Sequence, residues 1–196
     1  MRLRDCALLC AGLGITLSGC STVKPGGVTF DSESQTTIVT GNETTVSPLA
    51  GAVRTYFLKA EISPSQTGLY LVILYLSIDG WLSADKVVDS DGRKFEGLRG
   101  ADESFEAKYG RITKEIYHIP VTRRYLEQHR NSGLNFCLRG TKGTLAATQP
   151  ATYVQGFLTS LDSTQQRLAG EVIVKKLIAE PAKRGPAFRR RRLKAS

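Results

Sequence analysis

The run that most constrains the fold is residues 69–78, Leu-Tyr-Leu-Val-Ile-Leu-Tyr-Leu-Ser-Ile. Its aromatic and β-branched side chains favour an extended strand over a helix, and both faces of that strand are apolar. The run is also too short to span a bilayer as a helix. It therefore predicts a central strand covered on both sides, and a β-rich fold built around that strand.

Segments with strand and turn signals lie on both sides of this run. Residues 54–62 alternate apolar and polar side chains, which is the period of a half-buried strand. Asp89-Ser90-Asp91-Gly92 separates residues 81–88 from residues 93–98, and its Asp-Gly pair supplies the backbone angles of a tight hairpin. Further strands are predicted at residues 105–109, 115–119, 134–139 and 144–147, with a last one carrying Val172, Val174 and Ile178 before Pro181.

Two helices are predicted among these strands. Thr122 is a suitable N-cap for a short helix that runs to residue 129 or 130. The second helix begins near Pro150, ends at Asp162-Ser163 and has one apolar stripe at i, i+3, i+4 and i+7, formed by Val154, Phe157, Leu158 and Leu161. The sequence therefore predicts a mainly β fold: a single antiparallel β-sandwich or barrel-like domain with two short helices.

The N-terminal residues have a charge and hydropathy pattern that predicts a targeting signal. Arg2 and Arg4 precede an apolar run over residues 6–17, whose length suits a secretory signal. The run ends in Leu17-Ser18-Gly19-Cys20, which resembles the lipobox of bacterial lipoprotein signal peptides. The resemblance implies that the Cys20 sulfur takes a diacylglycerol, that cleavage frees the Cys20 amine, and that this amine is usually acylated too. The alternative is a cytosolic protein with a chance apolar start.

This resemblance divides the chain into four parts. Residues 1–19 are the signal peptide, residues 20–50 the lipidated Cys and a flexible tether, residues 51–180 the β-rich globular domain, and residues 181–196 a basic disordered tail. The tether is predicted from a segment rich in Ser, Thr and Gly with few large apolar side chains. Ser21 stands where inner-membrane lipoproteins often have Asp, so we expect a lipid anchor in the outer membrane, facing the periplasm.

The net charge of +9 comes mostly from the C-terminal end. Residues 183–196 contain no acidic residue and seven basic ones: Lys183, Arg184, Arg189, Arg190, Arg191, Arg192 and Lys194. Such a run is either a solvated end or a contact for a polyanion. Behind a lipobox the available anions are anionic lipid, lipopolysaccharide and cell-wall polymer, and nucleic acid is not an expected partner. The anionic-surface contact is assigned to Arg189, Arg190, Arg191, Arg192 and Lys194.

Cys137 is the one cysteine beyond the predicted anchor. Paired with His118 or His129 it would make a nucleophile and a base. Its place in an alternating strand instead favours a buried thiol that packs as a small hydrophobe.

Asp89-Ser90-Asp91-Gly92 is similar to the start of a calcium-binding loop. Arg93 and Lys94 follow at positions where such a loop needs further acids, so a hairpin turn is favoured over a metal site. The sequence thus predicts no catalytic residue, no metal ligand and no cofactor.

A second resemblance covers most of the folded part. A Tyr-rich apolar strand followed by a Trp and an Asp-Gly pair, and a Pro-x-x-Tyr-Val-x-Gly-Phe-Leu helix at residues 150–158, are similar to uncharacterised proteobacterial envelope proteins. We expect a lipid-anchored cell-envelope protein with a binding, structural or assembly role in the periplasm and envelope protein partners. The alternatives are a periplasmic enzyme acting on cell-wall material and a lipoprotein subunit of a secretion or conjugation apparatus. An open sheet edge favours the binding role, and a cleft of converging polar side chains favours the enzyme.

Overall fold

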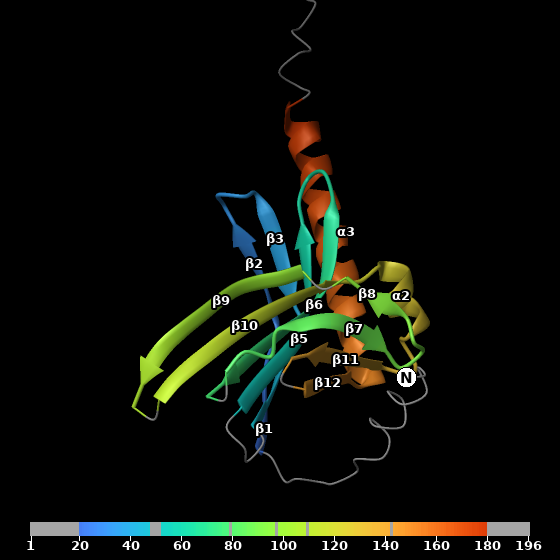
Figure 1. The fold of residues 1–196 in the computed structure, drawn as a ribbon. Coiled ribbons are helices and arrows are strands. Elements are labelled where there is room, and N and C mark those ends of the chain that lie inside the picture. Colours follow the sequence, from blue (N-terminus) through green and yellow to red (C-terminus); the bar gives the residue numbers. More distant parts are fainter. Residues whose placement is uncertain are drawn as a thin grey trace, which may run out of the picture. The chain divides into compact units, whose positions relative to one another are not determined.

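The computed structural model describes residues 20–47, 52–78, 80–96, 98–108, 110–141 and 143–179 (Figure 1). The predicted signal peptide at residues 1–19 and the predicted basic tail at residues 181–196 lie outside the described residues. The chain divides into two compact units, Met1–Leu161 and Asp162–Ser196. In the described part of the chain, no helix is both long enough and apolar enough to cross a membrane.

The first unit contains two antiparallel sheets. In the larger sheet the strands follow the order β1-β4-β5-β6-β10-β9. Strand β3 also pairs with β5, and β2 pairs with β3. The smaller sheet follows the order β12-β11-β7-β8. The strands of the larger sheet are β1 (Cys20–Lys24), β2 (Gly27–Asp31), β3 (Thr36–Thr40), β4 (Glu43–Ser47), β5 (Ala52–Ile62), β6 (Thr67–Ser77), β9 (Leu98–Ala107) and β10 (Gly110–Pro120). Those of the smaller sheet are β7 (Ala84–Asp89), β8 (Lys94–Phe95), β11 (Leu134–Gly140) and β12 (Gly143–Gln149).

The predicted fold class is confirmed as a mainly β sandwich with two helices. The two sheets pack together, and neither closes into a barrel among the described strands. The predicted central strand is β6, which lies between β5 and β10. Leu71, Val72 and Ile73 are buried in succession. Because successive side chains of a strand point to opposite faces, β6 is covered on both sides.

The predicted tether is wrong for residues 20–47, which form β1 to β4. These strands make one long hairpin with a bend in each arm: β1 pairs with β4, and β2 pairs with β3. The first arm is β1 and β2, and the second is β3 and β4; the second arm pairs along β5. The sequence of β3, Thr-Thr-Ile-Val-Thr, is entirely β-branched and therefore favours a strand despite its few large apolar side chains. We call this element the bent hairpin.

The hairpin predicted around Asp89-Ser90-Asp91-Gly92 is present. Its strands are β7 and β8, which pair Val87 with Phe95 and Val88 with Lys94. Gly92 has φ of +81°, the left-handed conformation that glycine adopts without strain.

The first helix agrees with its prediction, and the second is longer than predicted. Helix α2 (Arg123–Gln128) has Thr122 as its N-cap, whose side chain accepts the Tyr125 N–H. Helix α3 (Ala151–Ala179) continues past the predicted end at residue 162, so the predicted last strand at residues 172–178 is wrong. The segment after residue 162 holds Gln, Arg, Leu, Ala, Glu and Lys, which favour a helix, and it has no proline before residue 181.

A buried carboxylate joins the two sheets. Glu115 of β10 is fully buried; its Oε2 accepts the Leu82 N–H at 2.5 Å, and its Oε1 accepts the Ser83 N–H at 2.8 Å. The Tyr117 hydroxyl donates to Glu115 Oε1 at 2.6 Å and accepts the Ala84 N–H at 2.9 Å. These bonds fix the start of β7, in the smaller sheet, against β10 of the larger sheet.

Candidate functional site

The bent hairpin changes direction at Gly26 and Gly41, where its two arms approach each other closely. Gly26, between β1 and β2, donates its N–H to Asn42 Oδ1 at 2.9 Å, and Gly41, between β3 and β4, donates its N–H to the Leu58 carbonyl at 2.8 Å. A Cβ on Gly26 would lie 2.2 Å from the Thr40 carbonyl oxygen. Glycine is therefore required for the two arms to cross this closely.

Tyr153 of α3 is fixed against this bend. Its hydroxyl accepts the Leu58 N–H of β5 at 2.9 Å, and burial raises the pKa of Tyr153 to about 12. A Cβ on Gly41 would lie 2.3 Å from Tyr153 Oη, too close for any side chain. The absence of a side chain at Gly41 thus lets the tyrosine reach the backbone of β5.

A groove of about 240 Å³ opens between the bend and α3. We call it the fork groove, and it is lined by Gly26, Gly27, Val28, Thr40, Gly41, Asn42, Thr152, Tyr153, Gly156, Phe157 and Ser160. This lining contains no charged side chain. Its volume is below that of a typical small-molecule pocket, and it suits one or two uncharged side chains.

Strand β2 forms an open edge beside this groove. Within the described residues β2 pairs with β3 alone. Val28 lies directly opposite Val39, and Phe30 lies directly opposite Thr37. Val39 and Thr37 are buried, but Val28 is 45% exposed and Phe30 is 60% exposed. The core face of the sheet therefore continues onto β2, where it stays accessible.

The other outer strands lack this combination. Strand β9 carries exposed Asp102, Glu103 and Glu106, and charges on an edge strand disfavour pairing with another strand. Strand β12 is uncharged, but its exposed side chains, such as Thr148, are small. Strand β1 is also an outer strand, and it exposes one large apolar side chain, Val23, next to the charged Lys24. Among the described side chains of the outer strands, two large apolar ones are exposed together on β2, and one of them, Val28, lines the fork groove.

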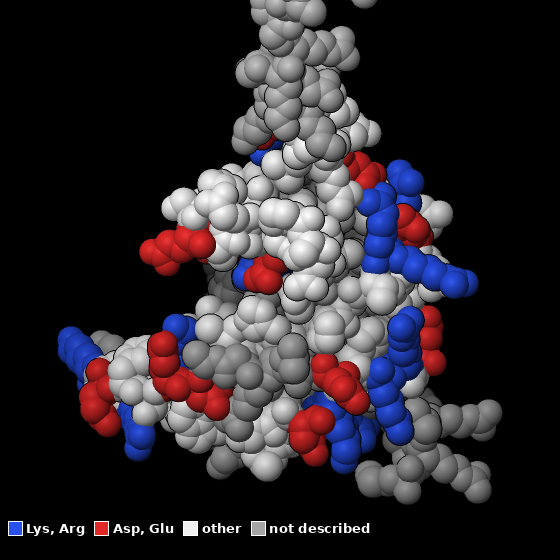
Figure 2. Space-filling view, turned by 90° about the horizontal axis from the view of Figure 1, so that it is seen from above, with Lys and Arg blue, Asp and Glu red and all other residues white. Residues whose placement is uncertain are grey.

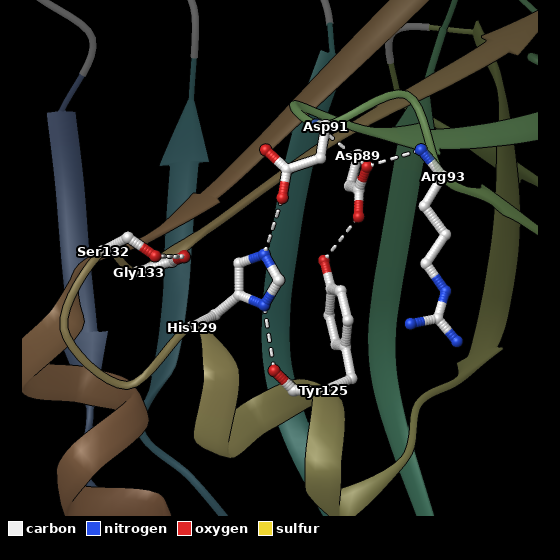
Figure 3. A network of polar contacts seen from close by, with 7 residues as sticks. All are labelled: Asp89, Asp91, Arg93, Tyr125, His129, Ser132 and Gly133. Atoms are coloured by element: carbon white, nitrogen blue, oxygen red, sulfur yellow. Dashed lines mark hydrogen bonds and ion pairs between the residues drawn. The ribbon is translucent and has the colours of Figure 1, made fainter.

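The residues that are similar to the start of a calcium loop form the predicted hairpin turn, capped by the Asp89 side chain (Figure 3). Asp89 Oδ1 accepts the Asp91 N–H at 3.0 Å and the Arg93 N–H at 2.8 Å, while Oδ2 accepts the Tyr125 hydroxyl at 3.0 Å. Asp89, Asp91 and His129 are the one group of three potential metal ligands within 4.8 Å in the described part of the chain. Both Asp89 oxygens already accept hydrogen bonds that stabilise the turn, so ligation by Asp89 would compete with these bonds.

The remaining contacts of this cluster fix α2 to the turn. His129 Nδ1 lies 2.9 Å from the Tyr125 carbonyl oxygen, and Nε2 lies 3.2 Å from Asp91 Oδ2. Burial, followed by the hydrogen bond to Asp89, raises the pKa of Tyr125 well above its usual range. The Arg93 guanidinium carbon lies 5.2 Å from the centre of the Tyr125 ring. The geometry is that of a packed structural cluster.

The two histidines and Cys137 occupy separate settings. Cys137 is buried in β11 of the smaller sheet, with Val88 and Ala146 as its register neighbours. His118 lies on β10 of the larger sheet, with its ring 5.9 Å from that of Tyr70. His129 contacts the α2 backbone and the turn, as described above.

Cys20, the predicted lipidation site, is the first residue of β1 and pairs with Ser47 of β4. The other residues of the lipobox-like motif, Leu17 to Gly19, lie outside the described residues, as do Arg189 to Arg192 and Lys194. On the face shown in Figure 2, acidic and basic side chains are interspersed. The expected anionic-surface contact thus rests on the tail sequence.

Sequence reasoning missed the fork groove and the β2 edge because it assigned residues 20–50 to a tether. The available signals were the β-branched run of β3 and the alternation of Val28 and Phe30. Compared with family models, with curated proteins and with solved structures, the chain finds no match in any of the three.

Proposed function

We propose that this chain is a lipid-anchored protein of the bacterial cell envelope that binds a polypeptide partner along β2, in a binding or assembly role. The observation that carries the binding role is the open β2 edge, on which Val28 and Phe30 are exposed and Val28 lines the fork groove. The lipobox-like Leu17-Ser18-Gly19-Cys20 supports the anchor. Ser21 supports placement in the outer membrane, facing the periplasm.

The anchor is physically sufficient to hold the protein on a membrane. Each buried methylene contributes about 0.8 kcal/mol, and a single acyl chain binds only marginally, whereas two or more bind stably. The tail residues Arg189 to Arg192 and Lys194 would add contacts with anionic lipid, lipopolysaccharide or cell-wall polymer.

The binding mode is strand addition. An extended segment of the partner would hydrogen-bond to the free edge of β2, and its alternate side chains would cover Val28 and Phe30. An uncharged side chain of that segment would enter the fork groove, whose lining has no charge. A subunit of a multiprotein envelope apparatus would use the same surface, and the identity of the bound segment would define that apparatus. The groove lining has no acid, base or thiol, which favours binding over catalysis on cell-wall material.

The anchor is tested by the intact mass and detergent partitioning of wild type and Cys20→Ala, expressed in a Gram-negative host. We expect a mature wild type that starts at residue 20, carries acyl mass and enters the detergent phase. We expect Cys20→Ala to keep its signal segment and to lack the acyl mass. An unprocessed wild type that stays in the aqueous phase contradicts the proposal.

The binding surface is tested by photo-crosslinking in the envelope with a benzoylphenylalanine at Thr29, the centre of β2. We expect an adduct that Phe30→Lys abolishes, because a buried lysine ammonium opposes strand addition. Phe105→Lys is the matched control, since Phe105 is also exposed on an outer strand of the same sheet. No adduct, or an adduct that both variants affect equally, contradicts binding along β2.

A further inference from the structure

The predicted lipid attachment site is part of the sheet itself. Strand β1 pairs with β4 over its whole length, from Cys20 opposite Ser47 to Lys24 opposite Glu43. Lys24 also lies 3.6 Å from Glu43 as an ion pair. No spacer therefore separates residue 20 from the folded unit, in contrast to a lipoprotein whose domain follows a long linker.

The register defines which residues lie at the same end of the sheet as Cys20. Beside the Cys20–Ser47 pair, Val46 of β4 pairs with Arg54 of β5, and Ala52 of β5 pairs with Ser77 of β6. Ile78 follows Ser77 and is 51% exposed. Neighbouring strands are about 4.8 Å apart, so β6 lies roughly 15 Å from β1 across this end.

We propose that this end of the larger sheet lies directly on the bilayer surface, with Ile78 in the interfacial region and Arg54 at the level of the lipid phosphates. The proposal rests on the lipidation of Cys20 in the proposed function. Acyl chains on residue 20 hold its backbone at the headgroups, and the β1–β4 ladder holds the neighbouring strand ends beside it. An exposed isoleucine gains hydrophobic contact there, and an arginine gains attraction to anionic lipid.

The same geometry directs the β2 edge away from the membrane. Phe30 pairs with Thr37, and Thr37 pairs with Ile62 of β5. Ile62 is eight residues beyond Arg54 on one strand, so it stands about 26 Å further along the sheet at about 3.3 Å per residue. The partner segment would therefore be met in the aqueous space above the headgroups.

Unpairing of β1 is the process that opposes this arrangement. The described side chains of β1, residues 21–24, are all exposed, so no buried side chain locks the strand in place. If β1 leaves β4 in the anchored protein, it becomes a tether, and contact between the sheet end and the bilayer is lost. The contact consequently reports whether the β1–β4 ladder persists on the membrane.

The test uses two variants of the acylated chain, each with a single fluorophore, one at each end of β6. Ile78→Cys marks the proposed membrane end and Gln66→Cys the opposite end, since they flank the same strand. Each cysteine is labelled with bimane; Cys137 is buried. The proteins are reconstituted in vesicles of phosphatidylethanolamine and phosphatidylglycerol that contain nitroxide lipids.

We expect quenching at position 78 several times stronger than at position 66. A Gly-Ser spacer of about 12 residues between Cys20 and Ser21, which spans roughly 20 Å, should abolish this difference while vesicle binding persists. An acylated chain with equal quenching at the two positions overturns the membrane contact alone. Unchanged quenching with the spacer overturns the role of the β1–β4 ladder. A chain whose mass shows no acyl groups overturns the anchor, and the inference with it.

Discussion

Gly41→Ala tests whether the bend of the hairpin depends on Tyr153. The new Cβ would lie 2.3 Å from Tyr153 Oη and 2.8 Å from its Cζ, so the ring must retreat. Overpacking costs about 1–3 kcal/mol, and the Leu58 N–H that loses its acceptor adds about 1–3 kcal/mol. We expect the free energy of unfolding to fall by about 3 kcal/mol, measured by urea denaturation followed by circular dichroism.

The sign of the effect should reverse when the ring is absent. In a Tyr153→Leu background the clash disappears, and only the lower entropy of the unfolded alanine chain remains, which stabilises by about 0.4–1 kcal/mol. The two backgrounds should therefore differ by about 3–4 kcal/mol in their response to Gly41→Ala, a coupling that a double-mutant cycle measures directly.

Gly27→Ala is the matched control, because a Cβ at Gly27 meets no atom within 4 Å. It should leave the urea midpoint unchanged or raise it slightly. The reasoning is refuted if Gly41→Ala destabilises the protein equally with and without the Tyr153 ring.

Three further measurements test other parts of the structure. Glu115→Gln should lower the free energy of unfolding by about 3 kcal/mol. In the wild type both carboxylate oxygens accept backbone N–H groups, whereas the glutamine NH₂ would face one of these N–H groups, donor against donor. An unchanged urea midpoint would contradict this. Burial, then the nearby Lys59 charge, lowers the pKa of His118 below 6.5 in the folded state. Neutral His118 therefore makes its full contribution to the free energy of unfolding above pH 6.5, and this contribution is lost as the pH falls through the folded-state pKa. In His118→Gln the free energy of unfolding should therefore decline less between about pH 7 and about pH 5 than in the wild type. If the free energies of the two proteins decline in parallel, His118 is not the titrating group. Asp91→Asn should lower the free energy of unfolding by less than about 1 kcal/mol, because the Asp91 side chain is 70% exposed and polar contacts of exposed side chains contribute little. A larger loss on urea unfolding would show that the Asp91–His129 contact contributes more than this exposure allows.

The predictions that agree with the structure rest on local signals. The apolar run in β6 is long enough to require burial on both faces, and the Asp-Gly pair at Asp91-Gly92 supplies the hairpin turn through its own backbone angles. Thr122 caps α2 through a bond to a residue three positions away. Each of these features is determined by side chains within a few residues of one another.

The features that were not predicted depend on distant partners. Residues 20–47 have few large apolar side chains, and their strands form because β5 offers an edge to β3 and β4. The fork groove joins residues 26–42 to residues 152–160, more than a hundred positions apart. In α3 the spacing of Val172, Val174 and Ile178 indicated a strand, but the helix formers around them outweigh that pattern.

One element links the two proposals, because the bent hairpin has the anchor residue at one end and the open edge at the other. Its first arm begins at Cys20 and ends in β2, and the change of direction lies at Gly26, opposite Gly41. Tyr153 holds this bend against β5 through the Leu58 N–H. Loss of that contact would leave the lipid and the binding residues intact, but the orientation of β2 relative to Cys20 would no longer be fixed. Gly41→Ala should therefore weaken the Thr29 adduct without changing the acyl mass, and an undiminished adduct would show that the bend does not orient the binding edge.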